Sequence, residues 1–323
     1  MRLSMELQTR VEIRPGSFHI DYASEILMLG SCFAENIGEK LRYFKFNVDV
    51  NPFGIVYNPL SVAKVLRLLL TGRLFTKEDL LCHDGKWLSL MHHGCFSSPD
   101  PEICLQQING RLADAAQRLR TMDVLVLTFG TAWVFRNKAD GAVVANCHKI
   151  PASAFVRSRL EVEDVVEEYR DLIGQLRLAN PRLTILFTVS PIRHWKDGAH
   201  GNQLSKSVLL LAIDRLVNEM EGVYYFPSYE IVMDELRDYR FYAEDMLHVT
   251  AQAVEYIWER FQEVCVEKGT TCLMSRIDKA NRALLHRPFE AESEKWQQFH
   301  QRALEEMGEI DREIAVLRSS KSQ

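Results

Sequence analysis

The sequence predicts an α/β protein with a doubly wound, flavodoxin-like parallel sheet and a C-terminal helical extension. Short apolar runs alternate with amphipathic segments along most of the chain, which is typical of βαβ units. The runs at 123–128 and 183–189 are almost wholly apolar, as in parallel strands that helices cover on both faces. With 323 residues, the chain can form one large α/β domain with extensions, or two domains.

Strands and helices are expected to alternate from residue 25 onward. Five apolar runs predict strands at 25–29, 46–50, 123–128, 183–189 and 223–226. Helical periodicity predicts helices at 33–44, 59–70, 103–120, 161–179, 203–221 and 250–268. Gly72 is a candidate C-cap and Thr250 a candidate N-cap for two of these helices. Between them, 87–92 favours a strand and the Ser/Pro run at 97–101 a loop.

The composition changes beyond Gly269, where the chain becomes more charged. Helical periodicity continues at 275–285 and 291–317, so we expect an α/β domain over 1–268 and a helical extension over 269–323. The final SSKSQ has the composition of a disordered end. Several apolar positions would face the main domain or a second subunit of a homo-oligomer: Trp296, Phe299, Leu304, Met307 and Ile310.

Composition excludes several classes of protein. A net charge of −5 argues against non-specific binding to nucleic acid, which needs a basic surface. No apolar run approaches the roughly 18 residues of a membrane span, and the first residues lack a secretory signal, so we expect a cytoplasmic protein. The seven scattered cysteines form no CxxC pair, which argues against structural zinc and favours reduced thiols. No nucleotide fingerprint is present, and we expect no cofactor.

Two adjacent histidines, His92 and His93, do not predict a metal site. Neighbouring residues on a strand point to opposite faces, so both rings cannot bind one metal ion from regular strand geometry. We therefore expect no metal in this protein.

The first strand ends in a sequence that could carry chemistry. In an open α/β sheet, ligands bind outside the carboxyl ends of the strands. Gly30 is followed by two potential nucleophiles, Ser31 and Cys32, directly before a helix. The first N–H groups of that helix would favour a thiolate and could hold an oxyanion. The simpler interpretation is that Ser31 only caps the helix.

A second candidate lies before the last predicted helix of the domain. Asp245 stands three residues before His248 in a loop segment. At this spacing the carboxylate can bind Nδ1 of the imidazole and leave Nε2 free as a base. The alternative is a surface aspartate and a capping histidine.

Taken together, these segments resemble a known family. Residues 30–34 read GSCFA, the signature of the GSCFA domain proteins, which are grouped with the SGNH (GDSL-like) hydrolases. The resemblance covers roughly 20–265 and is supported by four further motifs: NPFG at 51–54, FGTAW at 129–133, NCHK at 146–149 and SPIRHW at 190–195. It implies a nucleophile after the first strand and a DxxH pair late in the domain, matched by Asp245 and His248.

The resemblance favours Cys32 over Ser31 as nucleophile. Aligning the Gly-Asp-Ser-Leu block of GDS-type enzymes with residues 30–33 places Cys32 on the catalytic serine, whereas Ser31 requires a shift of one residue. A thiol at a helix N-terminus beside a histidine is also expected to have its pKa lowered towards neutrality. The expected triad is therefore Cys32 or Ser31 with His248 and Asp245.

The oxyanion hole of SGNH enzymes matches this sequence only in part. These enzymes use the N–H of the nucleophile, a glycine N–H after the second strand and an asparagine in a GxN motif. Gly54 can stand for the glycine, but Ala132 replaces the asparagine. The hydroxyl of Thr131 or the amide of Asn51 could take its place. Loss of one such donor typically costs about 10²–10³ in rate.

Polar residues after the third and fourth strands could bind a substrate. Arg193 could bind a carboxylate or phosphate, and Trp195 could stack on a sugar face. His194 and His148 belong to the same two polar clusters. The alternative is that both clusters are solvated loops.

The sequence therefore predicts an acyl-transfer enzyme, an esterase or an O-acyltransferase. Its substrate would be a small molecule or a carbohydrate-linked acyl group, the latter suggested only by the relatives. The alternative is a catalytically inactive module that binds or assembles, which the missing oxyanion asparagine favours. A metal-dependent hydrolase would require clustered ligands, which are not evident.

Overall fold

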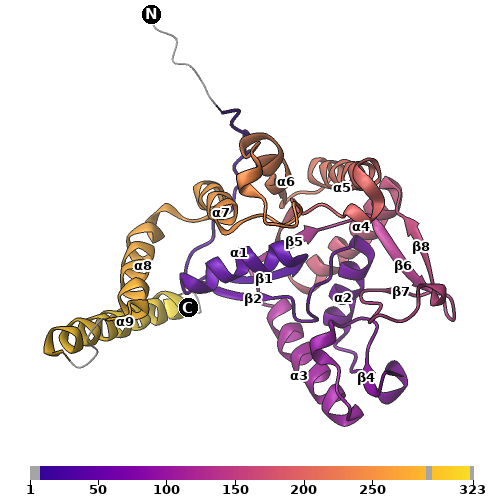
Figure 1. The fold of residues 1–323 in the computed structure, drawn as a ribbon, viewed down its shortest axis with the longest axis horizontal. Coiled ribbons are helices and arrows are strands. Elements are labelled where there is room, and N and C mark those ends of the chain that lie inside the picture. Colours follow the sequence, from indigo (N-terminus) through magenta and orange to yellow (C-terminus); the bar gives the residue numbers. More distant parts are fainter. Residues whose placement is uncertain (1–7, 289–292, 321–323) are drawn as a thin grey trace, which may run out of the picture.

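The computed structural model describes residues 8–288 and 293–320 (Figure 1). Its centre is a five-stranded sheet in which every neighbouring pair is parallel. The strands lie in the order β2 (Asn47–Val50), β1 (Glu25–Gly30), β5 (Val124–Phe129), β9 (Thr184–Val189) and β10 (Val223–Phe226). In chain order this is 2-1-3-4-5, the flavodoxin-like arrangement. The predicted doubly wound sheet and its five strands are confirmed.

Helices cover both faces of this sheet. One face carries α2 (Pro59–Thr71), α3 (Pro101–Leu119), α4 (Val162–Ala179) and α5 (Gly198–Glu219). The other carries α1 (Cys32–Tyr43) and α7 (Ala251–Cys265), with the short helix α6 (Ser228–Glu230) following β10. The predicted caps are both present, since Gly72 has a φ of 62° and Thr250 accepts from the N–H of Ala253.

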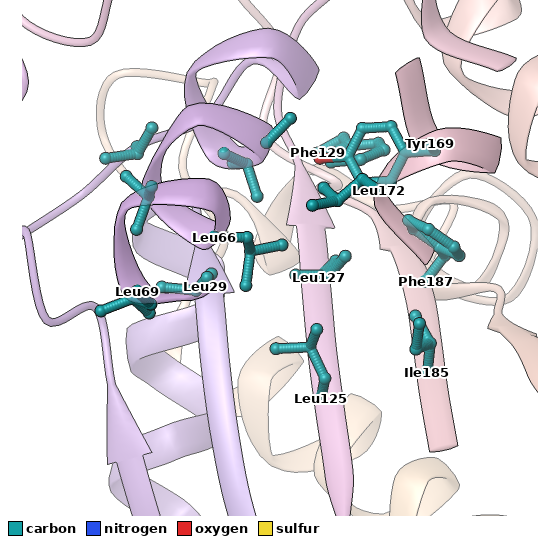
Figure 2. Packing of buried hydrophobic residues seen from close by; sticks show 14 of the residues in the cluster. Leu29, Leu66, Leu69, Leu125, Leu127, Phe129, Tyr169, Leu172, Ile185 and Phe187 are labelled. Atoms are coloured by element: carbon teal, nitrogen blue, oxygen red, sulfur yellow. The ribbon is translucent and has the colours of Figure 1, made fainter. Parts of the chain in front are cut away.

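Alternate residues of each strand supply the two cores. On β5, Leu125, Leu127 and Phe129 pack against the helices of the first face, as Figure 2 shows. Val124 and Val126 point to the α1 and α7 side. This two-residue alternation explains why the sequence of β5 is apolar throughout: neither face of the strand meets water.

Two smaller sheets were not predicted. One is a hairpin of β3 (Leu81–His83) and β4 (Lys86–Leu88), so only the beginning of the strand expected at 87–92 is present. The other has the antiparallel order β7-β6-β8 and is formed by the stretch of sequence that connects β5 to α4. Its strands are β6 (Trp133–Asn137), β7 (Val143–Val144) and β8 (Phe155–Arg159). They are short and mostly half-buried, which leaves little apolar pattern to detect.

The C-terminal extension consists of α8 (Thr271–Leu285) and α9 (Glu294–Ser320), which pack side by side at one end of the molecule (Figure 1). Ile277 and Ile310 join the core formed by α1 and α7. Of the apolar positions expected to face the main domain or a second subunit, Ile310 is buried, whereas Phe299 and Leu304 are 46% and 47% exposed in the single chain. Of the tail expected to be disordered, Ser319 and Ser320 are helical; 321–323 lie outside the described residues, as do 291–292 of the predicted helix.

Among the described residues, no helix has both the length and the apolar character that crossing a bilayer requires.

The turn from β1 into α1 depends on a glycine. Gly30 has a φ of +146°, and a Cβ built there would lie 2.2 Å from the carbonyl oxygen of Thr128 on the neighbouring strand. A side chain would therefore meet both backbone strain and a direct clash with backbone. The close approach of β1 to β5 at their ends exists because residue 30 has no side chain.

We predict that Gly30→Ala lowers the free energy of unfolding by about 3 kcal/mol or more, because strain and overpacking act together. Chemical denaturation followed by circular dichroism measures this. The matched control is Gly110→Ala in α3, where a Cβ would meet nothing within 4 Å. That change should stabilise the protein by up to about 1 kcal/mol, because alanine favours a helix. Equal effects of the two substitutions would contradict the account.

Candidate functional site

The candidate site lies where β1, β5 and β9 end next to one another. In the sheet register, Gly30 pairs with Thr128, and Thr128 pairs with Thr188. The three strands therefore reach the same edge, and the segments that follow them begin side by side. The N–H of Ser31 donates to the carbonyl of Thr128 at 3.2 Å, which ties the start of α1 to the end of β5.

Ser31 caps α1. Its side-chain oxygen accepts from the N–H of Phe33 at 3.3 Å, its backbone is extended, and only 4% of the residue is exposed. This is the simpler of the two roles predicted for Ser31. A buried hydroxyl engaged in capping is poorly placed to attack a substrate, whereas Cys32 is partly exposed at the first position of the helix.

The expected lowering of the thiol pKa does not occur at Cys32. Burial raises the pKa of this thiol, and the carboxylate of Glu35 adds to the increase. The backbone N–H groups of Phe33 and Cys32, followed by the positive charge of Lys206, act in the opposite direction without cancelling it. The prediction was wrong because it considered the helix N-terminus and neglected desolvation of the thiolate. The sulfur therefore rests as a thiol.

The Asp245–His248 pair forms a hydrogen-bonded unit in its loop. Nδ1 of His248 lies 2.5 Å from Oδ2 of Asp245. The other carboxylate oxygen accepts from the N–H groups of Leu247 and His248, each at 2.9 Å. Hydrogen bonding with the His248 side chain, then with these two N–H groups, lowers the pKa of Asp245 to about 2. The carboxylate thus stays charged and fixes Nδ1, while Nε2 of the half-exposed imidazole makes no hydrogen bond within the described residues.

Charge effects on the pKa values relate His248 to His194, and Lys206 to both His194 and Cys32. Burial, followed by the charge of Lys206, lowers the pKa of His194 to about 4, and His248 acts on it in the same direction. Lys206 also acts on Cys32. His194 lies at the end of β5, since a Cβ on Gly130 would be 3.2 Å from its Nε2. Charge effects thus link Lys206 with Cys32 and with His194, and His194 with His248, whereas no hydrogen bond joins His248 to Cys32 among the described residues.

Two of the three predicted oxyanion donors are engaged elsewhere. The N–H of Gly54 donates to the carbonyl of Asn51 at 2.7 Å within its turn. The hydroxyl of Thr131 is buried, lies 3.0 Å from that of Ser205 and accepts from the N–H of Trp133. Neither group is free to meet a substrate as expected. The N–H of Gly54 is already bonded within its turn, and the hydroxyl of Thr131 already contacts Ser205 of α5.

Asn51 lies beside the start of α1. Its side-chain oxygen accepts from the N–H of Gly30 at 2.9 Å, and its amide nitrogen donates to Glu35 at 3.3 Å. This contact uses one of the two amide hydrogens. The second has no partner among the contacts of the described residues, which leaves Asn51 as the one of the three with a spare donor.

Side chains of the segment after β9 line two different cavities. The side chains of Arg193 and Trp195 line a cavity of about 670 Å³ together with residues of the loop Asp245–Leu247. His194 lines another, of about 320 Å³, with Thr131 and His148. The four residues predicted to bind substrate therefore divide between two cavities, and only the first borders the Asp245 loop.

The first cavity has an unsatisfied cation and aromatic walls. The guanidinium of Arg193 lies 5.2 Å from the centre of the Trp195 ring, and its buried Nε has no hydrogen-bond partner in the described structure. Tyr239 and Tyr242 complete the wall. In the second cavity, the imidazole of His148 lies 2.9 Å from the carbonyl oxygen of Ser89, so its Nε2 is held by the protein itself.

Sequence reasoning missed Lys206, the one buried lysine next to the site in the described chain. It is 0% exposed, and its ammonium donates to the carbonyls of Gly130 and Ser190 at 2.7 and 2.6 Å. The signal was its position three and seven residues before the buried Leu209 and Ile213, which places it on the inner face of α5.

His92 belongs to the core. Its ring stacks on Phe53 at 4.2 Å, its Nδ1 lies 3.0 Å from the hydroxyl of Ser89, and burial lowers its pKa to about 3. Within residues 8–288 and 293–320, no group of three histidine, cysteine or acidic side chains is arranged to hold a metal ion.

The comparisons with known proteins identify one family. The GSCFA family model matches residues 25–261, which include every strand of the central sheet and the loop of His248. No curated protein matches the chain.

We predict that His194 stays neutral down to about pH 5, because burial and nearby cations disfavour its imidazolium and lower its pKa to about 4. Long-range ¹H–¹⁵N NMR of the imidazole, assigned with His194→Asn, measures the midpoint. A midpoint near the ordinary histidine value of about 6.5 would contradict the burial and charge described for this edge.

Proposed function

The chain belongs to the GSCFA family, and from this premise we propose that it is an acyl-transfer enzyme of SGNH type, an esterase or an O-acyltransferase. The observation that carries the proposal is the contact of 2.5 Å between His248 Nδ1 and Asp245, which leaves Nε2 without a hydrogen bond within the described chain. An imidazole fixed in this way is a general base. The partly exposed Cys32 at the start of α1 supplies the nucleophile that such a base would activate.

In the proposed reaction, the sulfur of Cys32 attacks the carbonyl carbon of an ester. Nε2 of His248 removes the thiol proton during the attack, because the raised pKa of Cys32 argues against a preformed thiolate. The carbonyl oxygen becomes an oxyanion, which the N–H of Cys32 and the spare amide hydrogen of Asn51 can stabilise. When the C–O bond breaks, His248 returns the proton to the departing alkoxide, and a thioester on Cys32 remains.

The second half of the reaction reverses the first. Water or an acceptor hydroxyl loses its proton to His248 and attacks the thioester carbonyl. The C–S bond breaks, the sulfur regains the proton and the acyl group leaves as an acid or a new ester. Asp245 keeps the imidazole oriented and stabilises its charged form in both halves.

The cavity beside the Asp245 loop is the proposed substrate site. Arg193 offers a cation without an ion-pair partner among the described residues, which could bind a carboxylate or phosphate, and Trp195 offers a flat apolar face. A sugar with an acidic substituent would satisfy both. The cavity of His194 and His148 is a second place where part of a substrate could bind.

One observation favours the alternative, a module that binds ligands without catalysis. The N–H of Gly54 and the hydroxyl of Thr131 are both engaged in contacts within the protein. An enzyme that lacks these donors must stabilise its oxyanion with fewer hydrogen bonds. The kinetic experiments below distinguish the two functions.

We predict that Cys32→Ala lowers kcat/KM for p-nitrophenyl acetate by at least about 10³-fold, because it removes the attacking atom. Ser31→Ala should change the rate less than about tenfold and cost about 1 kcal/mol of stability through loss of the cap. The control is Cys272→Ala on α8, an exposed cysteine that should leave the rate unchanged. If Cys32→Ala and His248→Ala both retain full turnover, the proposed function is wrong.

A second prediction concerns the orientation of the His248 imidazole by Asp245. Asp245→Asn should lower kcat by about 10²–10⁴-fold, because an amide cannot hold the imidazole in the required tautomer or stabilise its charge. The control is Asp311→Asn on α9, which removes an exposed carboxylate paired with Lys45 and should leave the rate unchanged. Stopped-flow absorbance of nitrophenolate release measures both variants. An unchanged rate in Asp245→Asn would show that His248 acts without this partner.

A further inference from the structure

Lys206 is a buried cation at the ends of two central strands. Its side chain leaves α5 and reaches the edge of the sheet, where it donates to the carbonyls of Gly130 after β5 and Ser190 after β9. No carboxylate pairs with it in the described structure, and one of its three N–H groups has no partner there. Burying a charge without a counterion is costly, so its presence at this position requires an explanation.

The ammonium of Lys206 lies near the end of β5, which is bonded to the start of α1. Gly130 follows Thr128 by two residues, and the carbonyl of Thr128 accepts the N–H of Ser31. The ammonium therefore lies at the same edge of the sheet as the turn that presents Cys32. Burial, followed by the charge of Arg193, lowers the pKa of Lys206 to about 7. A negative charge on Cys32 acts in the opposite direction and raises this pKa.

The groups that face this pair come from the segment after β9, from α6 and from α1. Around Lys206 are Arg193 after β9, His194 beside it and the ring of Tyr229 in α6, whose centre lies 5.6 Å from the ammonium. Around Cys32, the charged group besides Lys206 is Glu35, one turn further along α1. Glu35 opposes a thiolate, and Lys206 is the cation that favours it.

We propose that Lys206 is a positioning residue whose buried ammonium stabilises the negative charge that forms on the sulfur of Cys32. This inference rests on the proposed role of Cys32 as nucleophile. The step itself is a proton transfer: the thiol proton goes to the base, the sulfur keeps the electron pair, and the nearby ammonium lowers the energy of the resulting thiolate. Loss of the ammonium charge would leave only the N–H groups of Phe33 and Cys32 to oppose burial and Glu35.

A purely structural role is the competing explanation. Two strong hydrogen bonds could simply fasten the ends of β5 and β9 together. The two roles differ in what they require, since fastening needs N–H donors and thiolate stabilisation needs charge. Lys206→Gln keeps donors without charge, Lys206→Met removes both, and Lys206→Arg keeps both.

The experiment is alkylation of the folded, full-length protein with iodoacetamide from pH 6 to 10, followed cysteine by cysteine with mass spectrometry. We expect Lys206→Gln and Lys206→Met to slow alkylation of Cys32 about tenfold at pH 6, where Lys206 is charged, and to change it little above pH 8, where the lysine has lost its charge because its pKa is about 7. Lys206→Arg should restore most of the rate. Cys272, exposed on α8, is the internal reference and should not change. A Cys32 profile that is the same in wild type and in Lys206→Gln would overturn the proposal.

The reciprocal measurement needs no change at Lys206 and covers the case in which its variants do not fold. Because linked charges affect each other equally, a fixed negative charge at position 32 should raise the titration midpoint of Lys206: Cys32→Asp should give a higher midpoint than Cys32→Ser, observed through the ¹³Cε resonance of the lysine. Equal midpoints in the two variants would contradict the proposal. The thiol measurements do not depend on turnover: shifted profiles without ester hydrolysis would refute the proposed function alone, and normal hydrolysis with unshifted profiles would refute the role of Lys206 alone.

Discussion

The parallel pairing of β1 with β5, and of β5 with β9, is the constraint on which the site depends. The register brings Gly30, Thr128 and Thr188 level, so three loops leave the sheet at one edge. The absence of a side chain at Gly30 lets the first of these turn within van der Waals distance of β5 and begin α1 at once. Cys32, Gly130 and Ser190 become neighbours through this pairing, although almost 160 residues separate the first from the last.

The environment of Cys32 is a balance of opposing effects. Burial and Glu35 favour the thiol, whereas the helix N–H groups and Lys206 favour the thiolate. A nucleophile in such a balance is unreactive until a base removes its proton, which would protect it from oxidation and from stray electrophiles. The Asp245–His248 pair has the geometry of that base, and its exposed loop borders the cavity where a substrate would bind.

Much of the fold could be predicted from the sequence because each central strand is buried on both faces. Continuous apolar runs such as 123–128 have no other common explanation in a βαβ pattern. The strands β6 and β8 escaped prediction because they are half-buried and their sheet is small. In the site, the hydrogen bond between Asp245 and His248 was foreseeable because both groups belong to one short loop.

The remaining features of the site depend on contacts that spacing does not encode. Gly54 matched the expected glycine and Thr131 was a possible substitute for the missing asparagine, but a local turn and a contact with Ser205 engage their polar groups. The thiol pKa depends on how deeply α1 sits against the sheet. Lys206 lies in a helix more than 170 residues beyond Cys32, and only the folded sheet edge brings it near.

The most direct test of the central claim is to identify the atom that carries the acyl group. The protein is mixed with p-nitrophenyl acetate, quenched in acid during turnover, digested and analysed by mass spectrometry. The account predicts one acetyl group on Cys32, removable by neutral hydroxylamine as expected of a thioester, and none at this position in Cys32→Ala. Turnover with the acetyl group on Ser31, or with no acylated residue at all, would contradict it.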